Sequence, residues 1–185
     1  MRNALLIIDA QQELLDRNEQ EPNVYEKATL LNNINSVIKK ALVSESLIVF
    51  IRDKDVAEGM GKGFEIHQEL DIPKGAKIFD KEATNSFYGT PLLSFLQENE
   101  VEHLVMMGCK TEHCIDTAVR TATVNGFDVT LVGDGHSTTP SNTLTAEQII
   151  RHHNEVLHGH YNVDHFSVVR NTDENLFQPN HNEYR

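Results

Sequence analysis

The 185-residue sequence has no tryptophan, two cysteines, five prolines and far fewer basic than acidic residues, 16 against 28. No apolar run approaches the roughly 18 residues that a membrane-spanning helix needs, so we expect no transmembrane segment. The net charge of −12 argues against a nucleic acid or an anionic membrane as partner, because both require a basic surface. With 24% charged and 39% apolar residues, the composition is that of a soluble globular protein.

The two cysteines, Cys109 and Cys114, are five positions apart and fit no zinc-ligand pattern, and they are too few for a disulfide scaffold. We therefore expect reduced thiols and a cytoplasmic location. The N-terminus has one arginine and then an apolar run, which does not resemble a signal peptide. Because no linker or internal repeat interrupts the chain, we expect residues 1–185 to form a single domain.

Apolar runs typical of buried strands alternate with segments at helical spacing. The expected strands are Ala4–Ile8, Ser46–Ile51, Ala76–Asp80, His103–Met107, Phe127–Val132 and Phe166–Val169. The expected helices begin at Val24, at Thr90, after Cys114 and at Thr145. Regular alternation of this kind predicts parallel strands joined by right-handed crossovers. We therefore predict an α/β fold, a three-layer αβα sandwich with a parallel sheet of about six strands.

Cys114 occupies a position suited to chemistry. It follows the expected strand His103–Met107 and a short turn, and it opens a helical pattern. A helix N-terminus lowers the pKa of a thiol and favours the thiolate, and ligands of open α/β sheets bind beyond the carboxyl ends of strands. A free cysteine is, however, also a common small apolar residue of a core. The stretch alone leaves both interpretations open.

Two further residues, Asp9 and Lys81, also stand just past the ends of expected strands. In a parallel sheet these ends share one edge, so an acid, an ammonium group and the thiol of Cys114 can meet there. Each alone has an ordinary explanation, because Asp often caps a turn and Lys is usually solvated. Their joint placement favours catalysis, since a cysteine nucleophile needs a base and a charged partner within reach.

Four segments in this order carry a family resemblance: ALLIIDAQ at Ala4–Gln11, DKEATNSFYGTPL at Asp80–Leu92, MGCKTEHCIDTA at Met107–Ala118 and GFDVTLVGDGHST at Gly126–Thr138. The chain resembles the isochorismatase-like cysteine hydrolases, the superfamily that includes nicotinamidases and N-carbamoylsarcosine amidohydrolase. The resemblance implies a Rossmann-like strand order, 3-2-1-4-5-6. It also implies a catalytic triad that falls on Asp9, Lys81 and Cys114.

The resemblance further implies a cis peptide between Cys109 and Lys110, and an oxyanion hole made by the backbone N–H groups of Lys110 and Cys114. The implied activity is hydrolysis of a C–N bond of a small amide or ureido compound through a thioester, without a cofactor. Phe87 and Tyr88 follow Lys81 closely and are candidates for the substrate pocket, with packing in the core as an equal alternative. Glu112, in the turn of Cys114, is a third pocket candidate that can face either substrate or solvent. Members of the superfamily are commonly oligomers, so a homodimer or homotetramer is expected.

Nicotinamidases of this superfamily carry an Asp and several His after the second strand, and these residues hold a metal ion. Here the corresponding stretch is Arg52–Val56, with His67 as the only histidine nearby, so we expect no metal. The histidines near the C-terminus fit an exposed polar helix face better than a metal site. Two alternatives remain, an isochorismatase-type ether hydrolase and a non-catalytic binding protein. The presence of Cys114 argues against the first and the complete triad against the second.

Overall fold

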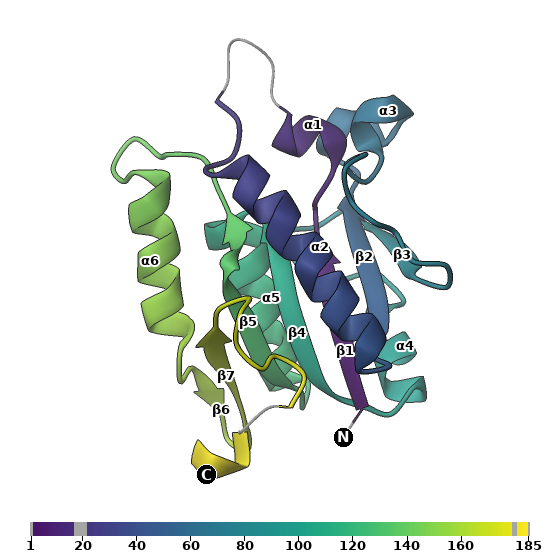
Figure 1. Ribbon diagram of the computed structural model, residues 1–185, viewed down its shortest axis with the longest axis vertical. Helices are drawn as coiled ribbons and strands as arrows, with labels where there is room; N and C mark the ends of the chain where they lie inside the picture. Colours follow the sequence, from purple (N-terminus) through teal and green to yellow (C-terminus); the bar gives the residue numbers. More distant parts are fainter. Residues whose placement is uncertain (1, 17–21, 179–180, 185) are drawn as a thin grey trace.

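A central β-sheet dominates the protein in a computed structural model that describes residues 2–16, 22–178 and 181–184. Within these residues the sheet has seven strands in the order β3-β2-β1-β4-β5-β7-β6 (Figure 1). The strands are β1 Arg2–Ile8, β2 Leu47–Asp53, β3 Lys77–Lys81, β4 Val101–Cys109, β5 Asp128–Ser137, β6 Tyr161–Asn162 and β7 His165–Arg170. All neighbours are parallel except the short β6, which pairs antiparallel with β7.

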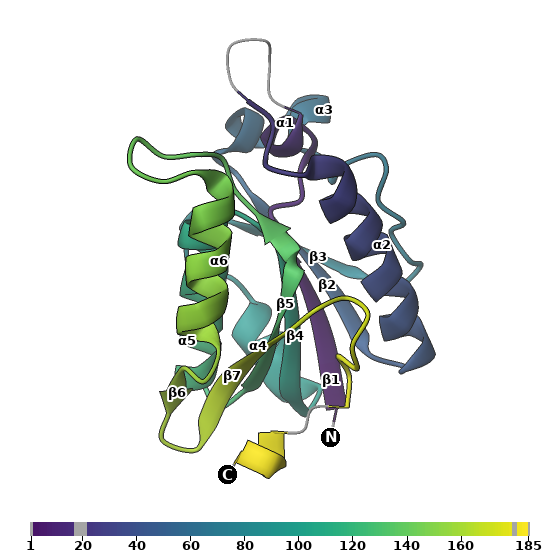
Figure 2. The same ribbon diagram turned by 60° about the vertical axis from the view of Figure 1, so that its left-hand side comes forward.

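Helices cover both faces of the sheet. The α-helices are α1 Gln12–Leu15, α2 Lys27–Val43, α3 Gly61–Phe64, α4 Leu92–Glu98, α5 Asp116–Val124 and α6 Ala146–Leu157. Shorter turns are the 3₁₀ segments η1 Val56–Gly59 and η3 His181–Tyr184, and the π-helical turn η2 Thr111–Ile115. Figure 2 shows α2 on one side of the sheet and α5 and α6 on the other. None of the helices in the described ranges is both long and apolar enough to cross a membrane.

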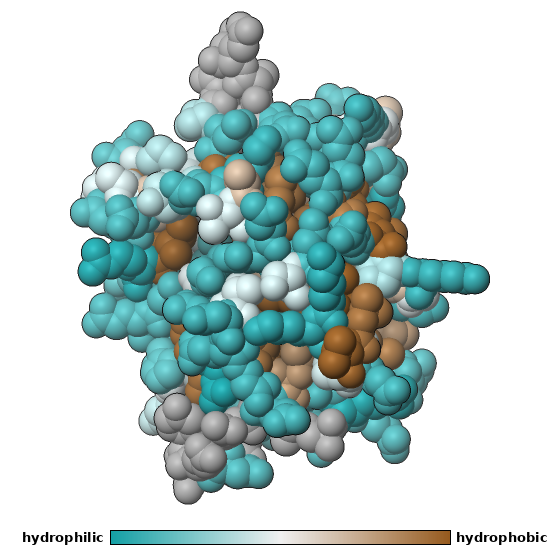
Figure 3. Space-filling model, viewed as in Figure 1, coloured by the Kyte–Doolittle hydropathy of each residue, from teal (hydrophilic) through white to brown (hydrophobic). Residues whose placement is uncertain are grey.

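The alternation of side chains along β1 explains the three layers. Leu5 and Ile7 pack in one core with the apolar stripe of α2, whereas Leu6 and Ile8 pack in a second core with α4 and α5. Successive strand residues point to opposite faces, so a continuous apolar run serves both cores at once. The outer face of α2 carries polar side chains, and the surface in Figure 3 is mainly hydrophilic with smaller apolar patches.

The predicted fold class and strand order are confirmed, with two differences of detail. The sixth expected strand is β7, and the two-residue β6 adds a short antiparallel edge. The fifth strand, expected to end at Val132, continues to Ser137 as β5, because a register shift lets Gly108 and Cys109 pair with His136 and Ser137. The helix expected from Thr145 is α6, and at its start Thr145 and Gln148 form the reciprocal hydrogen bonds of a capping box.

Gly108 allows β1 and β4 to approach closely at the edge where the site lies. Its φ angle is +124°, and a Cβ atom there would lie 2.0 Å from the carbonyl oxygen of Ile8. We expect Gly108→Ala to lower the free energy of unfolding by about 3 kcal/mol or more, measured by urea denaturation. Gly89→Ala is the control, because Gly89 also has positive φ but has no atom within 4 Å of its Cβ position. Equal losses in the two variants would mean that crowding against β1 is not the cause.

Candidate active site

Four ionisable side chains converge at the carboxyl edge of the sheet. Asp9 directly follows β1, Asp53 is the last residue of β2, and Lys81 is the last residue of β3. Cys114 lies in η2, the turn that follows β4. Because these four strands are parallel neighbours, their ends lie side by side. The edge therefore brings together residues that are more than a hundred positions apart in the chain.

The ammonium group of Lys81 is the centre of this cluster. Its Nζ lies 3.1 Å from Asp9 Oδ2 and 3.4 Å from Cys114 Sγ, and it also forms an ion pair with Asp53 Oδ2. Asp9 and Lys81 are each only 1% exposed, and Cys114 is 9% exposed. The structure thus places the three residues of the predicted triad in mutual contact.

Asp53 is a member of the cluster that the sequence analysis did not select. The side-chain amide of Gln11 donates to the carbonyl oxygens of Asp53, at 3.1 Å, and of Phe64, at 2.9 Å. The backbone N–H of Asp53 donates in return to Gln11 Oε1 at 2.7 Å. Gln11 is fully buried, so this reciprocal pair fixes the end of β2. The sequence contained an indication of this role, because Asp53 stands just past the end of an expected strand, as Asp9 does.

A pocket of about 400 Å³ opens above the cluster. Asp9, Asp53 and Cys114 lie at its base, and Glu13, Lys110 and His113 are among the residues of its walls. The volume falls in the range of small-molecule sites. The peptide bond between Cys109 and Lys110 is cis.

Three residues expected in the pocket lie elsewhere. Phe87 stacks against Phe127 with ring centroids 6.5 Å apart, in the core beneath α5. The side chain of Tyr88 is largely exposed. Glu112 accepts a hydrogen bond from Thr138 Oγ1 at 2.9 Å. None of the three is among the pocket-lining residues, because sequence proximity to Lys81 or Cys114 does not set the direction of a side chain.

Burial and neighbouring charges together set the protonation of the cluster. Burial raises the pKa of Asp9 to about 6, although the nearby Lys81 charge opposes the shift. For Lys81, burial favours the neutral amine, but the negative partners Asp9 and Asp53 outweigh it and keep the pKa above its usual value. At neutral pH the cluster therefore contains a carboxylate at Asp9 and an ammonium at Lys81.

The thiol of Cys114 differs from the expectation drawn from its place before a helix. Burial, followed by the charge of Asp9, raises its pKa to about 12, and Lys81 only partly offsets this. Cys114 also lies in a π-helical turn ahead of α5 rather than in the first turn of that helix. The expected lowering of the thiol pKa is thus wrong for the resting protein, which holds a protonated thiol beside a base.

This protonation state predicts slow alkylation. We expect iodoacetamide to modify Cys114 slowly at pH 7 and faster as the pH rises, because the thiolate is the nucleophile. Lys81→Ala should slow the reaction further, since it removes the positive charge that lowers the thiol pKa. Peptide mass spectrometry measures the rate at each cysteine, and the fully buried Cys109 is the internal control. A rate at Cys114 that does not change between pH 6 and pH 9 would contradict this assignment.

The cluster does not fit a metal ion. Ligand atoms of Asp9, Asp53 and Cys114 lie within 4.8 Å of one another, the spacing of a possible metal site. The ammonium of Lys81 already contacts all three, however, and a second positive charge there would be repelled. His67, the histidine nearest in sequence to Asp53, has its Nε2 3.3 Å from Asp16 Oδ2 and does not line the pocket.

A buried chain of hydrogen bonds holds the turn that carries Cys114. Thr111 Oγ1 lies 2.8 Å from His136 Nδ1, and His136 Nε2 lies 2.8 Å from Asn154 Oδ1. Since the Asn154 amide donates to the carbonyl of Gly133, its oxygen accepts from His136 Nε2–H, and the Thr111 hydroxyl then donates to Nδ1. Burial lowers the pKa of His136 to about 4, so the imidazole is neutral. The chain ties η2 to β5 and α6.

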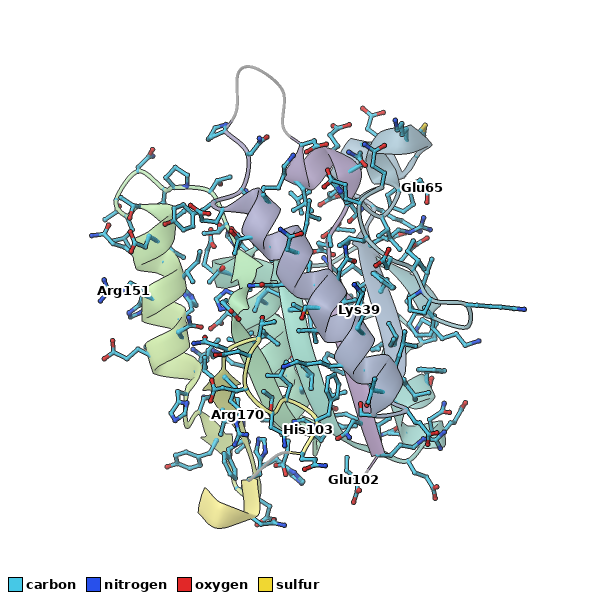
Figure 4. All side chains as sticks on the ribbon, in the orientation of Figure 1. Lys39, Glu65, Glu102, His103, Arg151 and Arg170 are labelled. Atoms are coloured by element: carbon cyan, nitrogen blue, oxygen red, sulfur yellow. The ribbon has the colours of Figure 1, made fainter. Side chains whose placement is uncertain are left out.

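Other buried histidines lie away from the pocket. Figure 4 shows Glu65 beside α3 at one end of the molecule, and His103 and Arg170 toward the other end. His103 contacts Asn3 and Thr130 through its two ring nitrogens, and burial lowers its pKa to about 3. Its position at the amino ends of the strands separates it from the cluster around Lys81.

Comparisons with known proteins agree with this architecture. The sequence profile of the Isochorismatase domain matches residues 3–154. The chain is 28% identical over 138 residues to the uncharacterized isochorismatase family protein YrdC of Bacillus subtilis, and the alignment covers 72% of each protein. A crystal structure described as an isochorismatase family protein has a TM-score of 0.82 at 27% identity, covering 91% of this chain and 97% of that one.

A further solved structure shares the fold. N-carbamoylsarcosine amidase from Thermoplasma acidophilum has a TM-score of 0.74 at 19% identity, and the match covers 95% of this chain and 99% of that one. At this identity the likeness concerns the fold alone. The profile match, in contrast, spans most of the chain, and the strand order and the related sequences agree with it. The protein therefore belongs to the isochorismatase-like hydrolase family.

Proposed function

We propose that this protein is a cysteine hydrolase that cleaves a C–N bond of a small amide or ureido compound through a thioester intermediate. One observation carries the proposal: the Lys81 ammonium contacts both the carboxylate of Asp9 and the thiol of Cys114 at the base of a pocket. A nucleophile, a base and a positive charge within reach of one another are what covalent catalysis requires. Membership of a hydrolase family supports the same chemistry.

The first half of the proposed reaction forms a thioester. Asp9 takes the thiol proton as Cys114 Sγ attacks the carbonyl carbon, so the thiolate need not exist beforehand. Lys81 stabilises the negative charge that develops on sulfur. The backbone N–H groups of Lys110 and Cys114 are proposed to hold the oxyanion, a role worth about 2.7–4 kcal/mol per donor in other enzymes. The protonated Asp9 then gives its proton to the leaving nitrogen, and the C–N bond breaks.

The second half of the reaction regenerates the thiol. Asp9, again a carboxylate, deprotonates a water molecule that attacks the thioester carbonyl, and the C–S bond breaks with return of the proton to sulfur. Asp9 Oδ1 is suited to both proton transfers, because it is buried and has no hydrogen-bond partner among the residues that the structure describes. The products are ammonia or an amine and a carboxylic or carbamic acid, and no cofactor is required.

Ammonia release from a panel of small amides and ureido compounds tests the proposed activity. Rapid acid quench followed by peptide mass spectrometry tests the intermediate, which should appear as an acyl adduct on Cys114. Turnover without any adduct, and without a burst of product, would argue against the thioester route. A wild-type enzyme that hydrolyses an enol ether but no amide would favour the ether-hydrolase alternative, and binding without any turnover would favour the binding protein.

Asp53 is proposed as a positioning residue that acts through Lys81 and Asp9. Its negative charge contributes to the raised pKa of Asp9, so Asp53→Asn should lower that pKa. Because Asp9 must be a carboxylate to act as a base, kcat/KM of the wild type should fall below about pH 6. In the variant the pH below which kcat/KM falls should be lower by about 0.5–1 unit.

The pH profile of kcat/KM for the wild type and Asp53→Asn measures this effect. Asp173→Asn is the matched control, because it removes the same charge from an exposed position beyond β7. If the pH at which kcat/KM falls is unchanged in Asp53→Asn, or shifts equally in both variants, Asp53 does not influence the pKa of Asp9.

The remaining expectations accompany this proposal. A single domain over residues 1–185, a cytoplasmic location and a homodimer or homotetramer stay predictions. Light scattering tests the last, and a mass near 20.9 kDa at micromolar concentration would refute it.

A further inference from the structure

We propose that the pocket selects an amide whose remote end carries a positive charge, such as an ammonium or guanidinium group. The inference rests on the proposed function, since it assigns the substrate class of the same site. Its basis is the unequal distribution of charge along the sheet edge. At the β4 side lie Cys114, Lys110 and His113, whereas the β2 side carries Asp53 and two more acidic residues, Asp55 and Glu13.

The order of the strands places Cys114 and the acidic wall residues on opposite sides of Asp9. Strand β1 lies between β2 and β4, so Asp9 stands in the middle of the edge. Asp55 precedes η1, and Glu13 belongs to α1, which packs against η1. A substrate carbonyl that meets Cys114 therefore has its remaining part directed toward the wall made by η1 and α1. That wall carries carboxylates.

The two wall carboxylates, Glu13 and Asp55, have no ion-pair partner among the described residues, whereas two basic residues that adjoin Asp53 in sequence are paired with other acids. Lys54 pairs with Glu82 at 2.7 Å, and Arg52 pairs with Asp80 and Glu65, each at 2.8 Å. Glu13 lies against α3, where a Cβ atom on Gly63 would come within 2.4 Å of its carboxylate oxygen. A glycine at position 63 thus leaves room for an acidic side chain at the pocket wall.

Acidic residues outnumber basic ones at the pocket. Asp9, Glu13, Asp53 and Asp55 line it together with Lys110, whose ammonium donates to Thr139 Oγ1 at 3.3 Å. The ammonium of Lys81 pairs with Asp9 and Asp53. Asp9, one of these lining residues, also has a buried Oδ1 without a hydrogen-bond partner among the described residues. Such a field attracts a cation and repels a carboxylate.

Apolar side chains lie beside the acidic ones. Leu14, Val56 and Ala57 line the same part of the pocket, next to Glu13 and Asp55. Methylene groups between the amide and the cationic end fit against these side chains, as the stems of lysine and arginine do on protein surfaces. The class of substrate assigned is therefore a short aliphatic amide with a basic group a few carbons from the carbonyl.

Three amides of similar shape and different charge test the inference: cationic β-alaninamide, neutral butanamide and anionic succinamate. We expect kcat/KM for ammonia release to decrease in that order in the wild type. In the double variant Glu13→Gln/Asp55→Asn, the ratio of cation to anion should fall by about fivefold per carboxylate removed. Raised salt should reduce the ratio in the wild type as well. Glu98→Gln/Glu155→Gln is the control, because it removes the same charge from exposed helix positions outside the pocket lining.

Calorimetric binding of the same three amides to Cys114→Ala separates this inference from the proposed function. Preferential binding of β-alaninamide without turnover by the wild type would refute the proposed amidase and support the charge preference. Hydrolysis or binding of succinamate as good as that of β-alaninamide would overturn the charge preference, whatever the activity. The charge preference would also be overturned if the ratio of kcat/KM for β-alaninamide to that for succinamate were unchanged in Glu13→Gln/Asp55→Asn. An equal fall of this ratio in the control variant would overturn it too.

Discussion

Replacing Cys114 with alanine is expected to abolish turnover, with a loss in kcat of about 10⁴-fold or more. Covalent catalysis has no substitute once the sulfur is removed, because neither Asp9 nor Lys81 can form the thioester. The fold should persist, since one small side chain beside a pocket contributes little buried area. Ammonia release measures the loss, and calorimetry measures whether the substrate still binds.

Cys114→Ser provides a second test of the same role. Its hydroxyl preserves the shape but is a weaker nucleophile, so activity should lie at or slightly above that of the alanine variant. Thermal denaturation of both variants excludes a folding defect as the cause. A Cys114→Ala protein that hydrolyses its amide at the wild-type rate would remove the proposed triad altogether.

Asp9→Asn should be nearly inactive, with kcat/KM reduced by about 10²–10⁴-fold. The amide of asparagine can occupy the same space near Lys81, but it cannot accept the thiol proton. The loss should persist across the pH range, because no titration restores a base at this position. Steady-state kinetics between pH 5 and pH 9 measure it. Recovery of activity at high pH would instead mean that the thiolate forms without Asp9.

The combination of the two changes shows whether Asp9 and Cys114 act as one unit. The double variant Asp9→Asn/Cys114→Ala should be scarcely slower than Cys114→Ala alone, because groups that serve the same step are not additive. If the two single losses multiply, Asp9 and Cys114 perform separate tasks.

The sequence predicted those features of the fold that depend on patterns within one segment. Alternation of strands and helices gave the three-layer sandwich, and the placement of Asp9, Lys81 and Cys114 after strands gave their shared edge. Both follow from topology, since parallel strands place all their carboxyl ends together. The sequence resemblance supplied the order of the strands.

Features that depend on contacts between distant segments were not predicted. The pKa of Cys114 is set by burial and by Asp9, and its position before a helix indicated the opposite shift. The role of Asp53 depends on which way its side chain turns at the end of β2, and Gln11 fixes that direction. The length of β5 depends on the register that β4 imposes beyond Met106. Each of these requires the relative placement of two elements.

The central position of β1 has a consequence for how the protein is made. This strand precedes the others in the chain, yet it pairs on one side with β2 and on the other with β4, so that Leu5 lies beside Val105. At roughly 5–20 residues per second, a ribosome needs several seconds or more to reach β4 after it has made β1. During that interval one edge of the apolar run Ala4–Ile8 stays open, and an open apolar strand edge is a site of misassembly. That edge closes only when β4, which ends at Cys109, has been made and pairs with β1.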